Sequence, residues 1–180
     1  VDSTGTARCW GSDSEDESSP PWDTFVSVSA GMDHTCGIDG DGDVQCWGFD
    51  GSGESSPPAG TFESVSAGVL YGGSHTCGID SDAAVQCWGN NDYGQSTEPT
   101  GTFSDVSAGH KHTCAVASSG AVRCWGDDYW GQATPPAGAF DTVSSGFEHS
   151  CGVDSSGDIQ CWGKNDEGQS TPPTDAAHRP

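Results

Sequence analysis

The tripeptide CWG occurs five times in this chain of 180 residues, and its spacing defines a repeat. The successive steps are 37, 41, 37 and 37 residues, and four additional residues between Gly68 and His75 account for the longer step. A period of this length is typical of solenoids and propellers, in which each unit buries its apolar face against its neighbours. We interpret the chain as one repeat array, 1–180, comprising a partial repeat 1–22, repeats 23–59, 60–100, 101–137 and 138–173, and a tail 174–180.

Each complete unit begins with a segment in which aromatic, valine and serine residues alternate. These segments read FVSVSAG from Phe25, FESVSAG from Phe62, FSDVSAG from Phe103 and FDTVSSG from Phe140. Alternation with period two, punctuated by Gly and Pro, indicates short β-strands, and helical periodicity is lacking. The expected fold class is all-β, a propeller-like array of short antiparallel blades with 37 residues per repeat.

Two cysteines ten residues apart enclose a turn sequence in every complete unit. If they face each other across an antiparallel hairpin, a three-residue loop fits, with a left-handed residue in third place. That place holds Gly42, Gly120 and Gly157, but Ala83 in the second unit, where we expect a modestly strained turn. The spacing predicts four disulfides within hairpins: Cys36–Cys46, Cys77–Cys87, Cys114–Cys124 and Cys151–Cys161.

The ninth cysteine, Cys9, has no partner in this pattern. Alignment of the first residues with the repeat places the expected partner two positions before Val1. We therefore expect Cys9 to be unpaired or joined to another molecule, and we interpret the chain as a section of a longer array.

Charge and composition argue against several classes of function. The chain has 27 acidic and five basic side chains and a formal charge of −22, which opposes binding to nucleic acid or to an anionic membrane. No run approaches 18 apolar residues, so membrane insertion is not expected. Nine cysteines without a CxxC pair favour an oxidising compartment, and we expect a secreted, extracellular or cell-surface protein.

The units resemble the regulator of chromosome condensation repeats. The shared pattern is VSAG, then HTC, a turn and VQCWGxNxxGQ, as in Val65–Gly68, His75–Cys77 and Val85–Gln95. The resemblance implies a β-propeller of four-stranded blades that binds proteins, since one member of the family exchanges nucleotide on a small GTPase and a secreted member inhibits β-lactamases. The cysteines and the short repeat are most similar to the secreted prokaryotic type.

Four histidines recur two residues before a repeat cysteine. A zinc site of the His-x-Cys type is one interpretation, but no consistent fourth ligand accompanies it. Repetition in every unit favours a structural role, such as an imidazole hydrogen bond to a neighbouring strand, for His34, His75, His112 and His149.

The first hairpin turn also resembles the start of a calcium loop. Asp39, Asp41 and Asp43 have the right spacing, but Asp50 stands at the twelfth position, where such loops carry glutamate. Turn chemistry explains these aspartates better, so we expect no metal site and no cofactor beyond weak Ca²⁺ binding.

A tryptophan follows each repeat cysteine, on the face of the strand opposite the disulfide. We expect these rings to form a ladder between adjacent blades, with a carbohydrate-binding strip as the alternative. They are Trp10, Trp47, Trp88, Trp125 and Trp162.

The repeat offers no nucleophile elbow and no unique set of Ser, His and Asp, so we expect no enzymatic activity. The clearest departures from the repeat are the inserted segment and two tryptophans outside the pattern. Such departures mark contact surfaces. We predict a contact surface formed by Val69, Leu70, Tyr71, Trp22 and Trp130.

Together these features predict a secreted, non-enzymatic repeat protein that serves as an extracellular structural or adhesive scaffold. Its partners would be copies of itself, in a filament, or another extracellular protein. The alternative is a protein-binding propeller module, of inhibitor or receptor type, that forms part of a larger closed ring. A lectin that uses the tryptophans is a third hypothesis.

Overall fold

The computed structural model describes residues 1–69 and 74–173. Within these ranges, twelve β-strands form four antiparallel sheets of three strands each. In chain order the strands are β1 (Phe25–Ala30), β2 (His34–Asp39), β3 (Val44–Gly48), β4 (Phe62–Ala67), β5 (His75–Asp80), β6 (Val85–Gly89), β7 (Phe103–Ala108), β8 (His112–Ala117), β9 (Val122–Gly126), β10 (Phe140–Ser145), β11 (His149–Asp154) and β12 (Ile159–Gly163). The predicted all-β array is confirmed.

The second and third strands of each sheet form the expected hairpin. In the first sheet Cys36 lies opposite Cys46 and Ile38 opposite Val44, and the other three sheets repeat this register. All four predicted disulfides are present, each within one hairpin. The spacing of the cysteines therefore predicted both the covalent bonds and the register.

The third residue of each hairpin loop has the expected left-handed backbone. Its φ is 87° at Gly42 and Gly120 and 82° at Gly157, whereas Ala83 occupies the same place with φ 61°. A side chain in this region crowds the following carbonyl oxygen, so Ala83 carries the strain that the sequence predicted.

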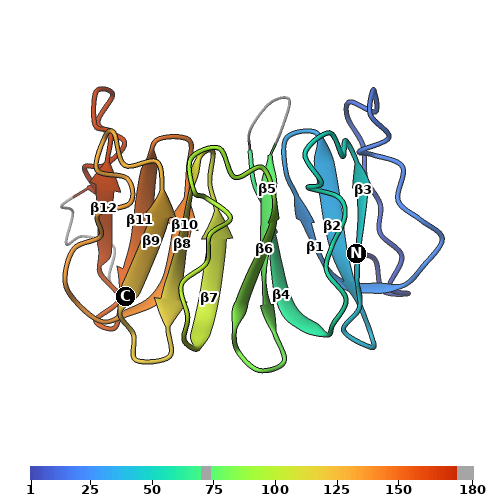
Figure 1. Cartoon of the computed structure of the whole chain (residues 1–180), viewed down its shortest axis with the longest axis horizontal. Helices are drawn as coiled ribbons and strands as arrows, with labels where there is room; N and C mark the ends of the chain where they lie inside the picture. The colour runs from blue at the N-terminus through green and yellow to red at the C-terminus, as the bar shows by residue number, and fades with distance from the viewer. Residues whose placement is uncertain (70–73, 174–180) are drawn as a thin grey trace.

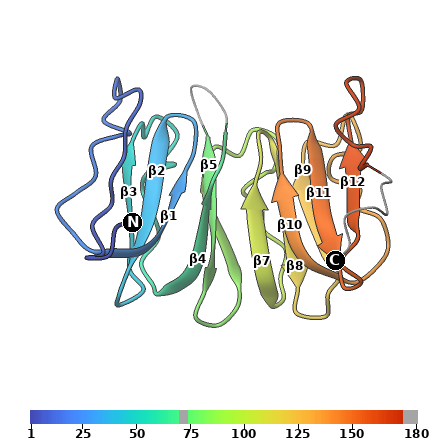
Figure 2. The same ribbon diagram turned by 180° about the vertical axis from the view of Figure 1, so that it is seen from behind.

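The four sheets stand side by side in chain order, as Figure 1 and the reverse view in Figure 2 both show. The first strands β1, β4, β7 and β10 contact one another in succession, and the second strand of each sheet contacts the first strand of the next. The sheets are thus arranged as the blades of a propeller are.

The resemblance implied four-stranded blades, whereas each sheet here has three strands. The segment after each CWG motif forms consecutive turns. In the second unit, for example, Gly94 N donates to Asn91 O and Thr97 N donates to Gly94 O, each at 3.1 Å. Backbone groups that bond within turns are not available for a fourth strand.

The apolar contacts lie between sheets. Phe62 and Trp88 of the second sheet pack against Ile38, Val44 and Cys46 of the first. The same cluster recurs between the third and fourth sheets. Four of the repeat tryptophans pack in such clusters between adjacent units, as predicted: Trp47, Trp88, Trp125 and Trp162. Trp10, the fifth, is exposed. The rings of Trp47, Trp88 and Trp162 also contact the phenylalanine that begins their own sheet.

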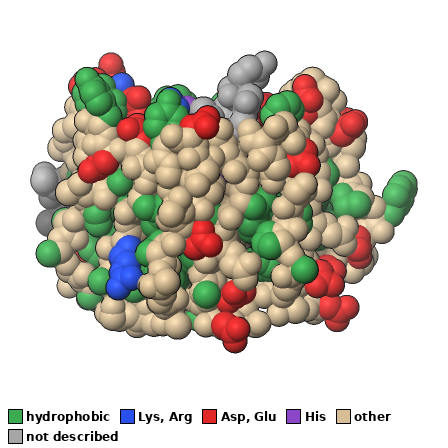
Figure 3. Space-filling view, in the orientation of Figure 1, with side chains coloured by type: hydrophobic (Ala, Val, Ile, Leu, Met, Phe, Trp, Pro, Cys, Tyr) green, Lys and Arg blue, Asp and Glu red, His purple; other side chains and the backbone are tan. Residues whose placement is uncertain are grey.

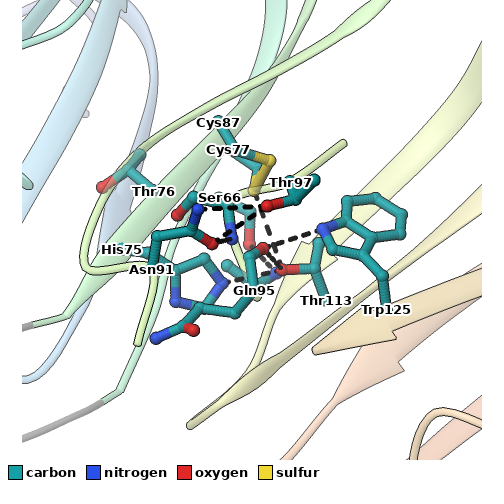
Figure 4. Close-up of a disulfide and its surroundings, with 12 residues drawn as sticks. Ser66, His75, Thr76, Cys77, Cys87, Asn91, Gln95, Thr97, Thr113 and Trp125 are labelled. Carbon is teal, nitrogen blue, oxygen red and sulfur yellow. Dashed lines mark hydrogen bonds between the residues drawn. A yellow bond between two sulfur atoms is a disulfide. The ribbon is translucent and has the colours of Figure 1, made fainter. Parts of the chain in front are cut away.

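A hydrogen-bond network accompanies each apolar cluster. His75 Nε2 lies 2.7 Å from Thr113 Oγ1 of the next sheet, and this hydroxyl donates to the carbonyl oxygen of Gln95 at 2.9 Å. The Trp125 indole donates to the same carbonyl at 2.8 Å, as Figure 4 shows beside the Cys77–Cys87 disulfide. Equivalent bonds join His34 to Thr76 and His112 to Ser150, both at 2.8 Å.

This network fixes the protonation of the histidines. Because the Thr113 hydroxyl donates to Gln95, Nε2 of His75 must carry the proton and donate, which leaves Nδ1 as a bare, buried acceptor. Burial lowers the pKa of His75 to about 3 and that of His112 to about 4, and it lowers the pKa of His34 as well. His34, His75 and His112 are therefore neutral parts of the interface between sheets.

We expect acid to destabilise the fold through these histidines. Below their ordinary pKa of 6.5 the unfolded chain binds protons that the folded chain rejects, so the free energy of unfolding falls as pH falls from 6.5 toward 4. Each histidine contributes a slope of about 1.4 kcal/mol per pH unit. Urea unfolding between pH 7.5 and 5 measures this slope. His75→Gln should reduce the slope, and a slope equal to that of the wild-type protein would refute the assignment.

Strain at the second hairpin turn gives a further prediction. Ala83→Gly should raise the free energy of unfolding by up to about 1 kcal/mol, because glycine adopts positive φ without steric cost. The matched change Gly157→Ala should lower it by about 1 kcal/mol, since a Cβ there meets nothing within 4 Å and only the backbone is strained. Thermal unfolding measures both changes. A Gly157→Ala variant as stable as the wild-type protein would contradict the argument.

Candidate functional site: an aromatic patch on the loop edge

The array has two edges with different loops. One edge carries the hairpin turns that join the second and third strands of each sheet. The other, here called the loop edge, carries the links between first and second strands and the turns that follow each CWG motif. In Figure 3 hydrophobic side chains gather along this edge at the upper left, above the sheets β7–β9 and β10–β12, with charged side chains among them.

Aromatic residues on the loop edge break the symmetry of the repeat. Tyr93 and Trp130 stand at the position that holds Ser52 in the first unit and Glu167 in the fourth. They and their neighbours form what we call the aromatic patch, which consists of Tyr93, His110, Lys111, Tyr129, Trp130, Phe147, Glu148 and Lys164.

The rings of the patch contact one another in pairs and are still open to solvent. His110 stacks on Phe147 with ring centroids 3.6 Å apart, and Tyr129 meets Trp130 edge to face at 4.9 Å. The exposed fractions are 80% for Tyr129, 53% for Phe147, 47% for Tyr93 and 40% for Trp130. Four exposed aromatic rings in one region are unusual on a surface that faces only water.

The chain has two lysines, and both belong to the patch. Lys111 Nζ lies 3.1 Å from the Tyr93 hydroxyl and 4.4 Å from its ring centroid. Lys164 Nζ lies 4.8 Å from the Trp130 ring centroid and 2.5 Å from a carboxylate oxygen of Glu148. The hydrogen bond between Lys164 and Glu148 lowers the pKa of Glu148 and raises that of Lys164, so both remain charged.

The structure describes three of the five predicted contact residues. Trp130 lies within the patch, and Val69 lies next to it on the loop edge, where its N–H donates to Gly109 O at 3.2 Å. Trp22 is fully exposed and lies just before β1 of the first sheet, with no contact to the residues of the patch among the contacts that define it. Leu70 and Tyr71 lie outside the described residues.

Most residues of the patch were missed at the level of sequence. Tyr93, Lys111 and Phe147 come from loops of different units, and each looks like an ordinary loop residue in isolation. The signal that could have found them is the repeat itself, because an alignment of the four units shows Tyr93 and Trp130 where other units have polar residues.

Cys9 is a free thiol in this structure. It is half-buried beside Ala7, Phe25 and Trp47, and burial raises its pKa, so it is protonated at neutral pH. These properties do not suit a nucleophile.

The aspartates of the hairpin turns act as the turn interpretation predicts. Asp39 Oδ1 accepts the N–H groups of Asp41 and Asp43 at 2.9 and 3.0 Å, and Asp80 does the same in the second unit. Within residues 1–69 and 74–173, no group of three or more His, Cys, Asp or Glu side chains is placed to hold a metal ion.

A buried carboxylate lies beside the inserted segment. Glu54 is 1% exposed, and its carboxylate accepts Ser52 N at 2.7 Å and Ser74 N at 3.1 Å. The third unit has Gln132 at this position, and its amide donates to Asp127 Oδ2 at 3.0 Å. A carboxylate suits Glu54 because two N–H donors face it.

Comparison with known families identifies the repeat. A family profile described as the regulator of chromosome condensation (RCC1) repeat matches residues 25–54, 62–95, 103–132 and 140–169. The chain belongs to this repeat family. Membership of a secreted prokaryotic type stays a prediction. No curated protein matches the chain significantly.

Solved structures with a similar fold include extracellular domains. The CRINKLY WD40 ectodomain of the Arabidopsis thaliana receptor kinase ACR4 is 27% identical with a TM-score of 0.65, over 78% of this chain and 50% of that one. The ectodomain of the Physcomitrella patens receptor kinase CR4 is also 27% identical, with a TM-score of 0.66 over 79% and 40%. Prp20p from Saccharomyces cerevisiae, at 17% identity and TM-score 0.69 over 82% and 47%, shares the fold. The chain spans about half the length of these structures or less.

Among the described residues there is no helix that is long and apolar enough to cross a membrane.

The buried carboxylate gives a prediction about the position shared by Glu54 and Gln132. Glu54→Gln should lower the free energy of unfolding by about 1–2 kcal/mol, because the amide NH₂ would face a backbone donor. The converse change Gln132→Glu should also destabilise, since it places a carboxylate against Asp127. Urea unfolding at pH 7.5 measures both variants, and wild-type stability of Glu54→Gln would show that its two hydrogen bonds are unimportant.

Proposed function

We propose that this protein is an extracellular, non-enzymatic binding module whose working surface is the aromatic patch. The observation that carries the proposal is the exposure of Tyr93, Tyr129, Trp130 and Phe147 together on the loop edge. A partner that covers these rings recovers the free energy of removing them from water, and Trp and Tyr are enriched among the residues that dominate protein interfaces.

Two observations support an extracellular location. Four disulfides persist only where thiols are oxidised, which is the condition outside the cell. The solved structures at 27% identity are ectodomains of receptor kinases. The low content of lysine and arginine leaves the surface acidic, and a high net charge favours solubility.

Binding rather than catalysis also agrees with the roles of the polar side chains. The buried histidines that could act as bases are engaged between sheets, as His75 is with Thr113. Carboxylates such as Asp39 and Glu54 are engaged with backbone N–H groups. These side chains thus contribute to structure.

Assembly into an extracellular scaffold or filament is the second candidate. It is favoured by the uniform contacts between sheets, because surfaces that stack repeatedly within a chain also suit stacking between chains. Light scattering with size-exclusion chromatography and electron microscopy separate the two candidates. Polymers that grow with concentration support the scaffold, and a monomer at all concentrations contradicts it.

The binding module is tested by changing the patch. Wild-type protein, Tyr129→Ala/Trp130→Ala and the control Trp22→Ala serve as baits in the extracellular fluid of the source organism, with quantitative mass spectrometry as the readout. Wild type and Trp22→Ala should retain a small set of proteins at least about tenfold better than the double variant, since loss of two central rings costs more than 1.4 kcal/mol. Equal retention by all three baits would rule out the patch as the working surface.

A further inference from the structure

The aromatic patch is surrounded by carboxylates. Exposed acidic side chains lie on the same loops as the rings, and we call them the acidic rim: Asp92, Asp128, Asp166 and Glu167. The loops that form the patch and rim contain six acidic residues and two lysines, a net charge of −4, in residues 90–94, 109–111, 127–131, 146–148 and 164–167. The patch is therefore apolar at its centre and negative around it.

The two lysines do not reverse this charge, because the patch itself holds them. Lys164 is paired with Glu148 at 2.5 Å and lies 3.9 Å from Asp166. Lys111 is held by the ring and hydroxyl of Tyr93. The two ammonium groups are thus engaged with Glu148 and Tyr93, whereas the carboxylates of the acidic rim face solvent.

The same contacts show what kind of group these rings attract. Two rings of the patch, Tyr93 and Trp130, already have an ammonium group over the face, at 4.4 and 4.8 Å from the centroid. Tyr129 and Phe147 are the most exposed rings, and no lysine or arginine from the part of the chain that the structure describes lies over them. His110 covers one face of Phe147, and the ring faces that stay open on Phe147 and Tyr129 are of the kind that the molecule fills with cations elsewhere.

We propose that the aromatic patch binds a basic segment of a partner protein, with arginine or lysine side chains over Tyr129 and Phe147 and the acidic rim around them. The proposal rests on the function proposed above for this surface and names the chemistry of the partner. Arginine suits the site best, because its planar guanidinium stacks on aromatic rings and pairs with carboxylates in two directions. The net charge of −22 adds long-range attraction for a basic partner and repels an acidic one.

The first test uses a display library of random linear peptides. Peptides selected on wild-type protein are depleted on Tyr129→Ala/Trp130→Ala, so that the remaining sequences depend on the patch. We expect arginine and lysine to be enriched at least about twofold over the unselected library, in keeping with the charge complementarity of the rim.

The outcomes of this selection are distinct from those of the bait experiment. Patch-dependent peptides that are neutral or acidic would overturn the basic partner and leave the binding module intact. A selection that yields no patch-dependent peptides would also overturn the proposal that the patch binds a basic segment. Failure of the proposed function itself is read from equal retention by the three baits, which does not involve the library.

The second test changes the rim and keeps the rings. Asp92→Asn/Asp166→Asn/Glu167→Gln should weaken a selected basic peptide by about tenfold at low salt and reduce the salt dependence of its Kd. The control removes three exposed charges near the hairpin-turn edge, as Asp41→Asn/Asp82→Asn/Glu63→Gln, and should weaken binding less than about twofold. Equal weakening by both triple variants would show that net charge alone attracts the peptide and would overturn the local rim.

Discussion

Contact between neighbouring sheets depends on one buried hydroxyl in each unit. Thr113 Oγ1 receives a hydrogen bond from His75 of the preceding sheet and donates to the carbonyl of Gln95, which also accepts the Trp125 indole. Three segments therefore meet at one side-chain oxygen and one carbonyl. Loss of any partner leaves a buried polar group unpaired, at a cost of about 1–3 kcal/mol, which explains why this arrangement recurs from unit to unit.

The disulfides and the apolar clusters act on different levels of this architecture. Each disulfide closes a hairpin, and so it fixes the register within one sheet without linking it to another. The clusters and the histidine bonds join sheets, as Phe62 and Trp88 do with Ile38. A chain with 32% hydrophobic residues can build an ordered array in this way, because each interface needs only a few large rings.

The fold could be predicted in detail because the repeat fixes it locally. Cysteine spacing determined the hairpin register, and the third loop residue determined the backbone at Gly42 and Ala83. The number of strands per blade could not be derived in this way. The resemblance implied four strands, whereas the segment after CWG forms turns and each sheet has three strands. The structural role of the histidines was expected from their repetition, while the partner of His75 on the next sheet required the structure.

The site was harder to predict for a physical reason. Its contacts join residues that are distant in sequence, such as His110 with Phe147 and Tyr93 with Lys111. Each lies in a loop where the local pattern requires only a turn, so the pattern says nothing about what the side chain touches. Glu54 is a similar case. Its second carboxylate oxygen accepts the N–H of Ser74, which belongs to the next unit, so the sequence around Glu54 does not show why a carboxylate is favoured there.

Recognition and architecture use different side chains in this array. The hydroxyls, histidines and tryptophans between sheets hold the units together, whereas the rings of Tyr129, Trp130 and Phe147 project from loops that these contacts do not require. Duplication of one unit would therefore copy a set of loop rings at a fixed distance from the original without disturbing the stack. A repeat of this design can acquire avidity by gene duplication alone, before any new contact has evolved.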